Sequence, residues 1–358
     1  MFNFYLSYKY LHWRTPASDG PLQPSTLPDN ITRFFIPTKG GNGNIEILYA
    51  APKTTNNDPP KSPIFFVHGG MGGAFVWLEY MTYLSARGIP CYAVSMRGHG
   101  NSWYPSFLRM VYGTTKRMLA DDIVTGIRWA QDHSGGQEIV LVGHSSGGGL
   151  CQFVLSEQEV KVKGLVLAAA VPGCGSMGVY WNWFKLDPWF TLRMLFHGWH
   201  PNSPLSHPAL IRRVFFSAEL TGAYVERFMA LSSPYESFLW PLGMGYPFVS
   251  ATKVLQQIMS RERGESIMVL CGGGDKIMTR SVMEKLAGFY RGAYAKLVGQ
   301  KKVDGETTKV EGIEGEGGED TAGQGVRFCV VSGAAHHLQN DVQWEIGARK
   351  LLEFYEKL

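Results

Sequence analysis

A serine framed by glycines, between a buried strand and a helix, constrains this chain more than any other feature. Residues 140–149 read VLVGHSSGGG and contain the pentapeptide Gly-x-Ser-x-Gly. An apolar segment over 138–142 predicts a strand before it, and the apolar spacing after it predicts a helix. A serine at such a corner adopts strained backbone geometry, so Gly143 and Gly147 have a steric reason to be glycine. This context favours Ser145 as an exposed nucleophile over an incidental serine in a strand-to-helix turn.

The chain on both sides of this corner alternates short apolar strands with amphipathic helices. The pattern predicts strands at 33–37, 45–51, 64–67, 89–95, 138–142, 165–170, 266–271 and 326–332, and helices at 74–87, 115–132, after 145, 280–290 and 341–356. Strands that are apolar throughout are typical of parallel sheets buried on both faces. The sequence therefore predicts an α/β fold in which helices cover both faces of a mostly parallel sheet.

Two stretches interrupt this alternation. Residues 172–260 show no clear strand pattern but many aromatic side chains, and we interpret them as a helical lid over the carboxyl edge of the sheet. Residues 300–325 are acidic and rich in glycine, a composition that buries too little surface to offset chain entropy, and they predict a flexible loop. The expected organisation is an irregular lead-in over 1–30, a core made of 31–171 and 261–358, and the lid between the two halves of the core.

The aromatic residues of the lid are candidates for the walls of a binding site. Trp181, Trp183 and Trp199 would supply buried surface for an acyl chain or a ring system. Ordinary packing inside the lid is the alternative, and the sequence leaves it open for each of these rings.

Composition excludes several other kinds of protein. The chain has 358 residues, of which 45% are hydrophobic and 18% charged, which indicates a well-packed globular protein and not a disordered one. A net charge of +4 without any dense run of Lys or Arg argues against nucleic acid as a partner. No stretch reaches the ~18 apolar residues of a spanning helix, and the aromatic N-terminus either packs on the protein or lies on a membrane surface.

The cysteines and the last residues bear on the compartment. Five scattered cysteines without a C-x-x-C pair indicate free thiols in a reducing compartment, so we expect a cytoplasmic protein. The final residues, Tyr-Glu-Lys-Leu, resemble a peroxisomal tripeptide only weakly, because glutamate stands at its first position. We expect neither a metal ion nor a cofactor.

Two residues downstream of Ser145 have the chemistry to activate it, because a serine hydroxyl needs a base and the base needs an acid to orient it. A Gly-x-Ser-x-Gly corner predicts the chain order serine, acid, histidine, with both partners at the carboxyl ends of later strands. Asp275 and His336 each follow a predicted strand through a short loop of small residues. Asp275 could instead cap the next helix, and His336 could be a hydrogen-bonded loop histidine. His337 is the neighbouring alternative to His336, which we prefer because it lies nearer the strand end.

A glycine-rich loop after the strand at 64–67 offers amide donors for a developing oxyanion. The loop reads HGGMGG over 68–73, and glycine lets backbone N–H groups approach a ligand closely. We expect the amides of Ser146 and Gly70 to be the donors, with Met71 as the less favoured choice. A simple strand-to-helix turn is the alternative, and a phosphate loop is excluded because no lysine follows the glycines.

A second glycine-rich turn follows the strand at 89–95. It reads MRGHGNS over 96–102, and we interpret it as structural. We expect His99 in this turn, like His68 in the first loop, to brace its loop and not to act as a base.

Together these pieces resemble the motif series of the α/β-hydrolase superfamily, and most of all its lidded, lipase- and esterase-like branch. The matching pieces, in chain order, are VHGG at 67–70, RGHGNS at 97–102, GHSSG at 143–147, GD at 274–275 and GAAH at 333–336. The resemblance covers residues 60–175 and 260–356 and leaves out the lid and the acidic segment. One departure is Ala335, where the family pattern has glycine before the histidine.

The resemblance implies an eight-stranded, mostly parallel sheet with the active site between sheet and lid. It implies Ser145 as nucleophile, His336 as base and Asp275 as the acid that orients the base, with Gly70 and Ser146 as oxyanion donors. The expected activity is cofactor-free cleavage of an uncharged, fairly apolar ester, thioester or lactone. Acyl transfer or C–C bond hydrolysis on the same three residues, and a non-catalytic ligand-binding receptor, are alternatives that the fold leaves open.

Overall fold

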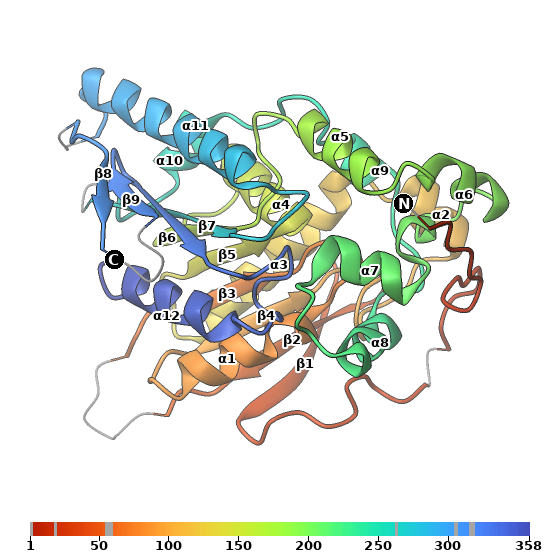
Figure 1. Ribbon diagram of the computed structural model, residues 1–358. Helices are drawn as coiled ribbons and strands as arrows, with labels where there is room; N and C mark the ends of the chain where they lie inside the picture. The colour runs from red at the N-terminus through yellow and green to blue at the C-terminus, as the bar shows by residue number, and fades with distance from the viewer. Residues whose placement is uncertain (1–2, 18–19, 54–59, 262–263, 304–306, 315–318) are drawn as a thin grey trace.

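One sheet organises the part of the chain that the structure describes. The computed structural model describes residues 3–17, 20–53, 60–261, 264–303, 307–314 and 319–358, and these residues form a ten-stranded sheet flanked by helices (Figure 1). The strands are β1 (Ile31–Pro37), β2 (Asn44–Ala50), β3 (Ile64–Val67), β4 (Cys91–Ser95), β5 (Val140–His144), β6 (Gly164–Ala168), β7 (Ile267–Gly272), β8 (Glu311–Ile313), β9 (Asp320–Gly323) and β10 (Val326–Val331). Their order across the sheet is β1-β2-β4-β3-β5-β6-β7-β10-β9-β8. The fold is α/β, as the alternating pattern predicts.

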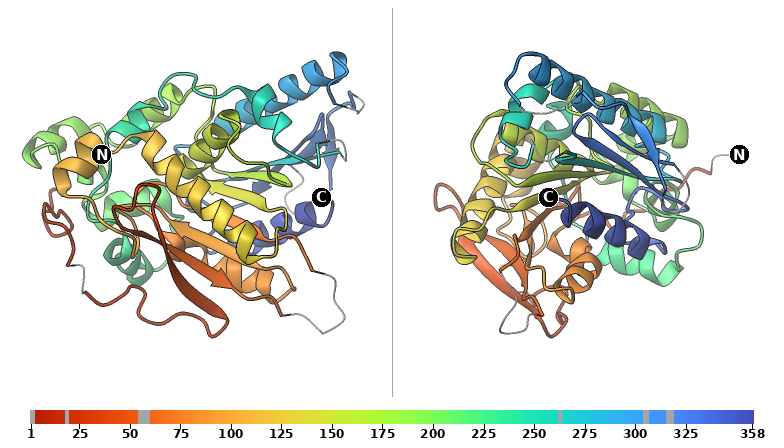
Figure 2. Two further views of the ribbon diagram at one scale, coloured as in Figure 1. Left: turned by 180° about the vertical axis from the view of Figure 1, so that it is seen from behind. Right: turned by 90° about the vertical axis from the view of Figure 1, so that its left-hand side faces the viewer.

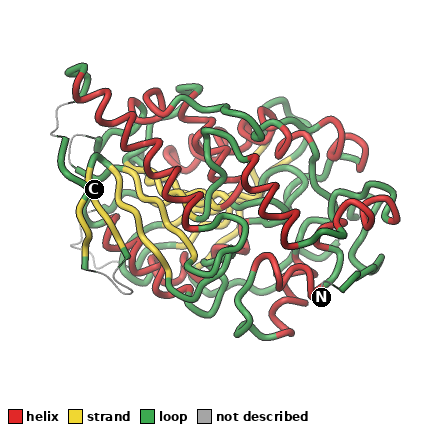
Figure 3. Tube along the Cα trace, turned by 45° about the horizontal axis from the view of Figure 1, so that its top comes forward, coloured by secondary structure: helices red, strands yellow, loops and turns green. Residues whose placement is uncertain are grey.

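The strands lie side by side in one sheet (Figure 3), whose centre is parallel and whose two margins are antiparallel. Neighbouring strands pair in parallel from β4 through β3, β5, β6 and β7 to β10. β1 and β2 form an antiparallel hairpin beside β4, and β9 and β8 add antiparallel strands beside β10. Every residue of these central strands is buried, which explains their continuous apolar runs. Because they are parallel, the loops that follow β3, β5, β7 and β10 meet at one edge of the sheet.

Helices cover both faces of the sheet (Figure 2). On one face lie the 3-10 turn η1 (Ala74–Trp77), α1 (Leu78–Ser85) and α12 (Trp344–Tyr355), and α12 packs against α1. On the other face lie α3 (Lys116–His133), α4 (Ser145–Ser156), α10 (Ala251–Gln256) and α11 (Arg280–Gly299). Helix α3 begins where the Thr115 side chain accepts a hydrogen bond from the backbone N–H of Met118. It buries Leu119, Ile123 and Ile127, which share one helical face, against the sheet.

Most of residues 172–260, from here on the insertion, lies beyond the carboxyl ends of the central strands (Figure 1), whereas its last helix, α10, packs against α4 and α11 on the face of the sheet. The insertion contains α5 (Met177–Leu186), α6 (Phe190–Phe196), η2 (Ser203–Leu205), α7 (Pro208–Phe215), α8 (Gly222–Leu231), α9 (Leu239–Leu242) and α10. Helix α2 (Phe107–Gly113), from the core, packs beside α9. Helices α5 to α9 therefore lie over the edge at which the loops of the sheet meet (Figure 1), within the region where the sequence predicts a helical segment.

The N-terminal residues lie along the insertion. The ring of Phe4 meets that of Trp189 edge to face, with 6.0 Å between centroids, and the hydroxyl of Tyr8 donates to the carbonyl oxygen of Phe196 at 2.9 Å. No helix or strand is assigned to the described part of residues 1–30, in line with an irregular lead-in.

The acidic segment 300–325 is where the fold differs from expectation. We expect a loop there, but β8 and β9 extend the sheet beyond the eight strands that the resemblance implies. β9 pairs with β10 through its backbone, and the carboxylate of Asp320 accepts a hydrogen bond from Nζ of Lys350 at 2.5 Å. Backbone pairing with β10 and a buried ion pair thus hold β9 in place, although the segment has little apolar surface to bury. Residues 304–306 and 315–318 lie outside the described residues.

Candidate active site

Ser145 stands at the corner between β5 and α4, at the carboxyl edge of the sheet. Its φ is 52°, in the left-handed region that residues with a side chain rarely adopt. A Cβ on Gly143 would lie 2.6 Å from the Cα of Gly148, and a Cβ on Gly147 would lie 2.0 Å from the carbonyl oxygen of His68. The strand, the turn and the helix therefore pack too closely for another residue at either glycine.

Two residues from other strands reach Ser145 in a chain of hydrogen bonds. His336 follows β10, and its Nε2 lies 3.0 Å from the Oγ of Ser145. Its Nδ1 lies 2.8 Å from the Oδ2 of Asp275, which follows β7. The loops after β7 and β10 meet because these strands are parallel neighbours. The structure thus brings together the three residues that the sequence singles out.

The surroundings of Asp275 fix its carboxylate in place. Its Oδ1 accepts hydrogen bonds from the backbone N–H groups of Ile277 and Met278, each at 2.9 Å. Its Oδ2 faces His336, and both side chains are buried. Asp275 therefore bonds the turn before α11 with one oxygen and the imidazole of His336 with the other, and it does not cap α11, which begins after Thr279.

The two adjacent histidines have different surroundings. His336 faces Ser145, whereas the Nδ1 of His337 lies 3.2 Å from the Oδ1 of Asn340. Burial lowers the pKa of His337 to about 3, so the ring is neutral. His144, next to Ser145 in the chain, donates from Nε2 to the carbonyl oxygen of His336 at 3.0 Å. This arrangement agrees with the preference for His336 over His337 and adds His144 as its support.

The glycine-rich loop over 68–73, from here on the amide loop, lies against the start of α4. The backbone N–H of Gly70 donates to the Oγ of Ser146 at 2.9 Å. The backbone N–H of Met71 donates instead to the Oε2 of Glu236 at 2.8 Å. The Met71 amide is thus already bonded to the insertion, while Gly70 lies beside Ser145 in the lining of a cavity.

His68 and His99 brace the two glycine-rich loops, as expected. The Nδ1 of His68 donates to the carbonyl oxygen of Gly69 at 2.7 Å, and its Nε2 accepts from the backbone N–H of Met96 at 3.2 Å. Burial lowers the pKa of His68 well below its ordinary value, so this ring is neutral. His99 bonds the carbonyl oxygen of Arg97 and also reaches Glu236 of the insertion.

A cavity of about 180 Å³ opens beside Ser145 and His336. The insertion supplies most of its apolar wall, including Val179, Trp183, Leu205, Phe215 and Trp240. It also supplies one carboxylate, that of Glu236. The cavity can therefore hold a mainly apolar group with its polar atoms near the serine.

Of the three tryptophans proposed from the sequence, only one lines the cavity as the structure describes it. Trp183 lines the cavity, with its ring 6.4 Å from that of Phe215. Trp181 and Trp199 are 58% and 51% exposed, and neither is among the residues that line it. Trp181 and Trp183 are two positions apart on α5, and residues with that spacing point to opposite sides of a helix. Trp181 stacks on Phe184 at the surface instead.

Most residues of the cavity wall were not predicted from the sequence, and two of them, Phe215 and Glu236, lie close to the predicted site residues. Phe215 ends α7, and its ring centroid lies 5.5 Å from that of His336. Glu236 lies in the loop between α8 and α9, where neither periodicity nor a motif marks it. Only the spatial position of the insertion reveals either contribution.

The described residues form neither a metal-binding cluster nor a membrane-spanning helix. Within the described ranges, no three His, Cys, Asp or Glu side chains are grouped to hold a metal ion. The helices found in the described part of the chain are all too short or too polar to span a bilayer. The five cysteines are free thiols, four of them buried.

The sequence matches the model of the alpha/beta hydrolase fold family over residues 62–300. This match covers more than half of the chain, and the chain belongs to that family. The family assignment agrees with the sheet, with the corner at Ser145 and with the loops that gather around it.

Sequence relatives include mammalian lipases. Over 155 residues the chain is 33% identical to human (Lyso)-N-acylphosphatidylethanolamine lipase, an alignment that covers 43% of this chain and 37% of that protein. The bovine protein of the same name is 32% identical over 107 residues, which cover 30% of each chain. The chain thus aligns with well under half the length of these curated relatives.

Solved structures with a similar fold include esterases and lipases. A soluble variant of monoglyceride lipase from Saccharomyces cerevisiae superposes with a TM-score of 0.58 at 12% identity, covering 94% of this chain and 99% of that one. An esterase from Exiguobacterium antarcticum also gives 0.58, at 14% identity, covering 91% and 100%. A thermophilic esterase from Thermogutta terrifontis gives 0.54 at 17% identity, covering 91% and 98%. At these identities the likeness establishes the fold.

Proposed function

We propose that this protein is a serine hydrolase that cleaves an uncharged, fairly apolar carboxylic ester, thioester or lactone. The observation that carries the proposal is the hydrogen-bonded chain from Ser145 Oγ through His336 to Asp275, at the mouth of a cavity with mainly apolar walls. A nucleophile, a base within hydrogen-bond reach and an acid that orients the base are the components that acyl transfer to serine requires.

The reaction proposed has two halves. The Oγ of Ser145 bonds to the substrate carbonyl carbon while its proton passes to Nε2 of His336, and the carbonyl electron pair moves to oxygen. When the bond to the leaving oxygen or sulfur breaks, His336 returns the proton to that atom. Water then attacks the acyl-enzyme, with His336 taking its proton and handing one back to Ser145. Asp275 holds the tautomer of His336 that this sequence needs.

The oxyanion would be stabilised by backbone amides. Gly70 and Ser146 lie beside Ser145 in the cavity lining and are the donors proposed. The Met71 amide is the weaker choice because it already donates to Glu236. A substrate oxygen can replace the Ser146 hydroxyl as acceptor of the Gly70 N–H, since that hydroxyl is free to rotate.

The substrate class rests on the walls of the cavity. Apolar side chains such as Val179, Trp183 and Phe215 suit an acyl chain or a ring system. The relatives named as (Lyso)-N-acylphosphatidylethanolamine lipases and the fold neighbours named as esterases support an ester of an apolar acid. We also assign the insertion the role of a lid, whose movement would admit substrate and release product.

A serine-directed fluorophosphonate probe tests the nucleophile. We expect the wild-type protein to be labelled at Ser145 and the Ser145→Ala variant to remain unlabelled. Ser146→Ala is the matched control, because it removes the adjacent hydroxyl and leaves the nucleophile, so labelling should persist. Absence of labelling in the folded wild-type protein would contradict hydrolysis and favour a ligand-binding receptor.

A panel of nitrophenyl esters of increasing acyl length measures the substrate class. We expect a distinct optimum of kcat/KM with chain length, set by the cavity. Adding an alcohol acceptor and analysing the products separates hydrolysis from transfer. A new ester as the main product would replace the hydrolase proposal by an acyltransferase.

A further inference from the structure

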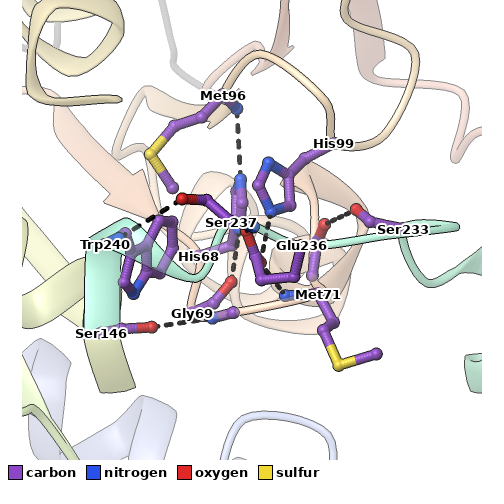
Figure 4. Close-up of polar contacts among 12 residues, drawn as sticks. His68, Gly69, Met71, Met96, His99, Ser146, Ser233, Glu236, Ser237 and Trp240 are labelled. Carbon is purple, nitrogen blue, oxygen red and sulfur yellow. Dashed lines mark hydrogen bonds and ion pairs between the residues drawn. The ribbon is translucent and has the colours of Figure 1, made fainter. Parts of the chain in front are cut away.

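Glu236 reaches from the loop between α8 and α9 to the amide loop (Figure 4). Its Oε2 accepts hydrogen bonds from the backbone N–H of Met71 and from Nε2 of His99, both at 2.8 Å. Its Oε1 accepts a third, from the backbone N–H of Ser237, also at 2.8 Å. The carboxylate lines the cavity that contains Ser145, yet none of the catalytic steps proposed above uses it.

His99 carries the positive charge that balances Glu236. Its Nδ1 lies 2.9 Å from the carbonyl oxygen of Arg97, and its Nε2 faces the carboxylate. Both oxygens can only accept, so both ring nitrogens must donate and the ring is an imidazolium. Burial alone would lower the pKa of His99, but the Glu236 charge raises it above its ordinary value. Burial alone would raise the pKa of Glu236, but the His99 charge lowers it.

The carboxylate of Glu236 stands next to the amide that would stabilise the oxyanion. A Cβ on Gly70 would lie 3.7 Å from Oε2 of Glu236 and 3.6 Å from Oγ of Ser146. A carboxylate without a cation at this place would repel the negative charge that develops on a substrate oxygen. His68, whose ring lies 4.6 Å from that of His99, is neutral and cannot balance it. His99 is placed to do so.

The same loop of the insertion holds the backbone of Met71. The φ of Met71 is 62°, a conformation that a residue with a side chain rarely adopts without support. Its N–H is bonded to Glu236, and its carbonyl oxygen accepts from the backbone N–H of Ser233 at 2.9 Å. The insertion therefore holds both the N–H and the carbonyl group of Met71, the residue that directly follows Gly70.

We propose that His99 and Glu236 form a positioning pair for the oxyanion site: Glu236 fixes the amide loop through Met71, and His99 neutralises the carboxylate beside Gly70. The inference rests on the serine hydrolase proposed above. Neither side chain touches the reacting atoms. Glu236 belongs to the insertion and His99 to the core. The pair would therefore make catalysis by the core depend on the position of the insertion.

A charge-rescue experiment tests the balancing role. His99→Gln keeps a donor toward Glu236 but removes the cation, and we expect kcat on a nitrophenyl ester to fall about 10²-fold with KM within about threefold. The double variant His99→Gln/Glu236→Gln removes both charges and should recover to within about tenfold of wild type. If the double variant is slower than His99→Gln alone, the two residues only pack together and the charge-balancing role is overturned.

A second pair of variants tests the hydrogen bond to Met71 without touching His99. Glu236→Gln keeps an acceptor for the Met71 N–H, whereas Glu236→Leu removes it at similar size. We expect Glu236→Leu to lose about 10²-fold in kcat and Glu236→Gln to lose clearly less. Equal losses in both variants would overturn the positioning role. If His99→Gln does not fold, the comparison of Glu236→Gln with Glu236→Leu still tests the positioning role.

A buried ion pair whose residues do not line the cavity is the matched control. Lys350→Met and Asp320→Asn disrupt the pair between α12 and β9. Lys350→Met and its double variant with Asp320→Asn should lower Tm while leaving kcat unchanged, because no catalytic group depends on this pair. A fall in kcat comparable to that of His99→Gln would overturn the inference, since loss of any buried charge pair would then explain the effect.

Fluorophosphonate labelling of Ser145 separates this inference from the function on which it rests. A wild-type protein that is labelled and hydrolyses esters, but in which the charge-rescue and Gln/Leu comparisons both fail, overturns the positioning pair alone. A folded wild-type protein that is not labelled overturns both.

Discussion

The carboxyl edge of the sheet and the insertion both contribute to the candidate site, but they are held in place differently. Ser145, Asp275 and His336 each follow a strand of the parallel sheet, so backbone pairing fixes their relative positions. The insertion places Trp183 by helix packing and Glu236 by a few hydrogen bonds from a loop. The proposed reactive groups thus stand at the ends of paired strands, while much of the shape and charge of the cavity comes from a separately packed part of the molecule.

The largest effect should come from the sheet edge. Ser145→Ala removes the proposed nucleophile, and we expect kcat to fall about 10⁴-fold or more, measured on the best nitrophenyl ester. Ser134→Ala, in the turn after α3, is a control that should keep full activity. If Ser145→Ala loses less than tenfold, the reaction does not proceed through this serine and the comparison between edge and insertion loses its basis.

Asp275→Asn should have the next largest effect. The amide cannot stabilise the imidazolium that forms on His336, and it favours the wrong tautomer, so kcat should drop about 10³-fold. Circular dichroism would check that the fold survives the loss of this buried carboxylate. Activity close to wild type would place the acid elsewhere, with the insertion as the first region to search.

Changes in the wall of the cavity should act on substrate selection more than on chemistry. We expect Trp183→Ala to raise KM about tenfold for long acyl chains and much less for acetate esters, because it removes apolar surface from the cavity. Trp181→Ala, on the opposite side of α5, should change neither constant. Equal effects of the two substitutions would mean that the outer face of the insertion also binds substrate.

The sequence could predict the residues of the sheet edge because their positions follow from strand ends. The glycines around Ser145 leave a local pattern, and Asp275 and His336 come directly after apolar runs of strand length. The order of these three residues along the chain, each at the end of a predicted strand, is enough to expect them at the same edge of the sheet. Family membership, which the match over 62–300 establishes, agrees with that expectation.

The sequence could not show which side chains of the insertion line the cavity. Trp181 and Trp183 look alike in the sequence, and only the orientation of α5 separates the exposed ring from the one in the cavity. Glu236 carries no local signal, because its partners His99 and Met71 lie more than a hundred residues away. The strands in the acidic segment were also missed, since β9 depends on pairing with β10 and on Lys350 more than on its own composition.

The place of β10 in the sheet has a consequence for biosynthesis. This strand lies between β7 and β9, and His336 follows it by a few residues. Ser145 leaves the ribosome nearly two hundred residues before His336, the histidine whose Nε2 bonds its Oγ. A nascent chain interrupted before β10 would therefore expose an unreactive hydroxyl, so the proposed chemistry would begin only after this strand has been translated.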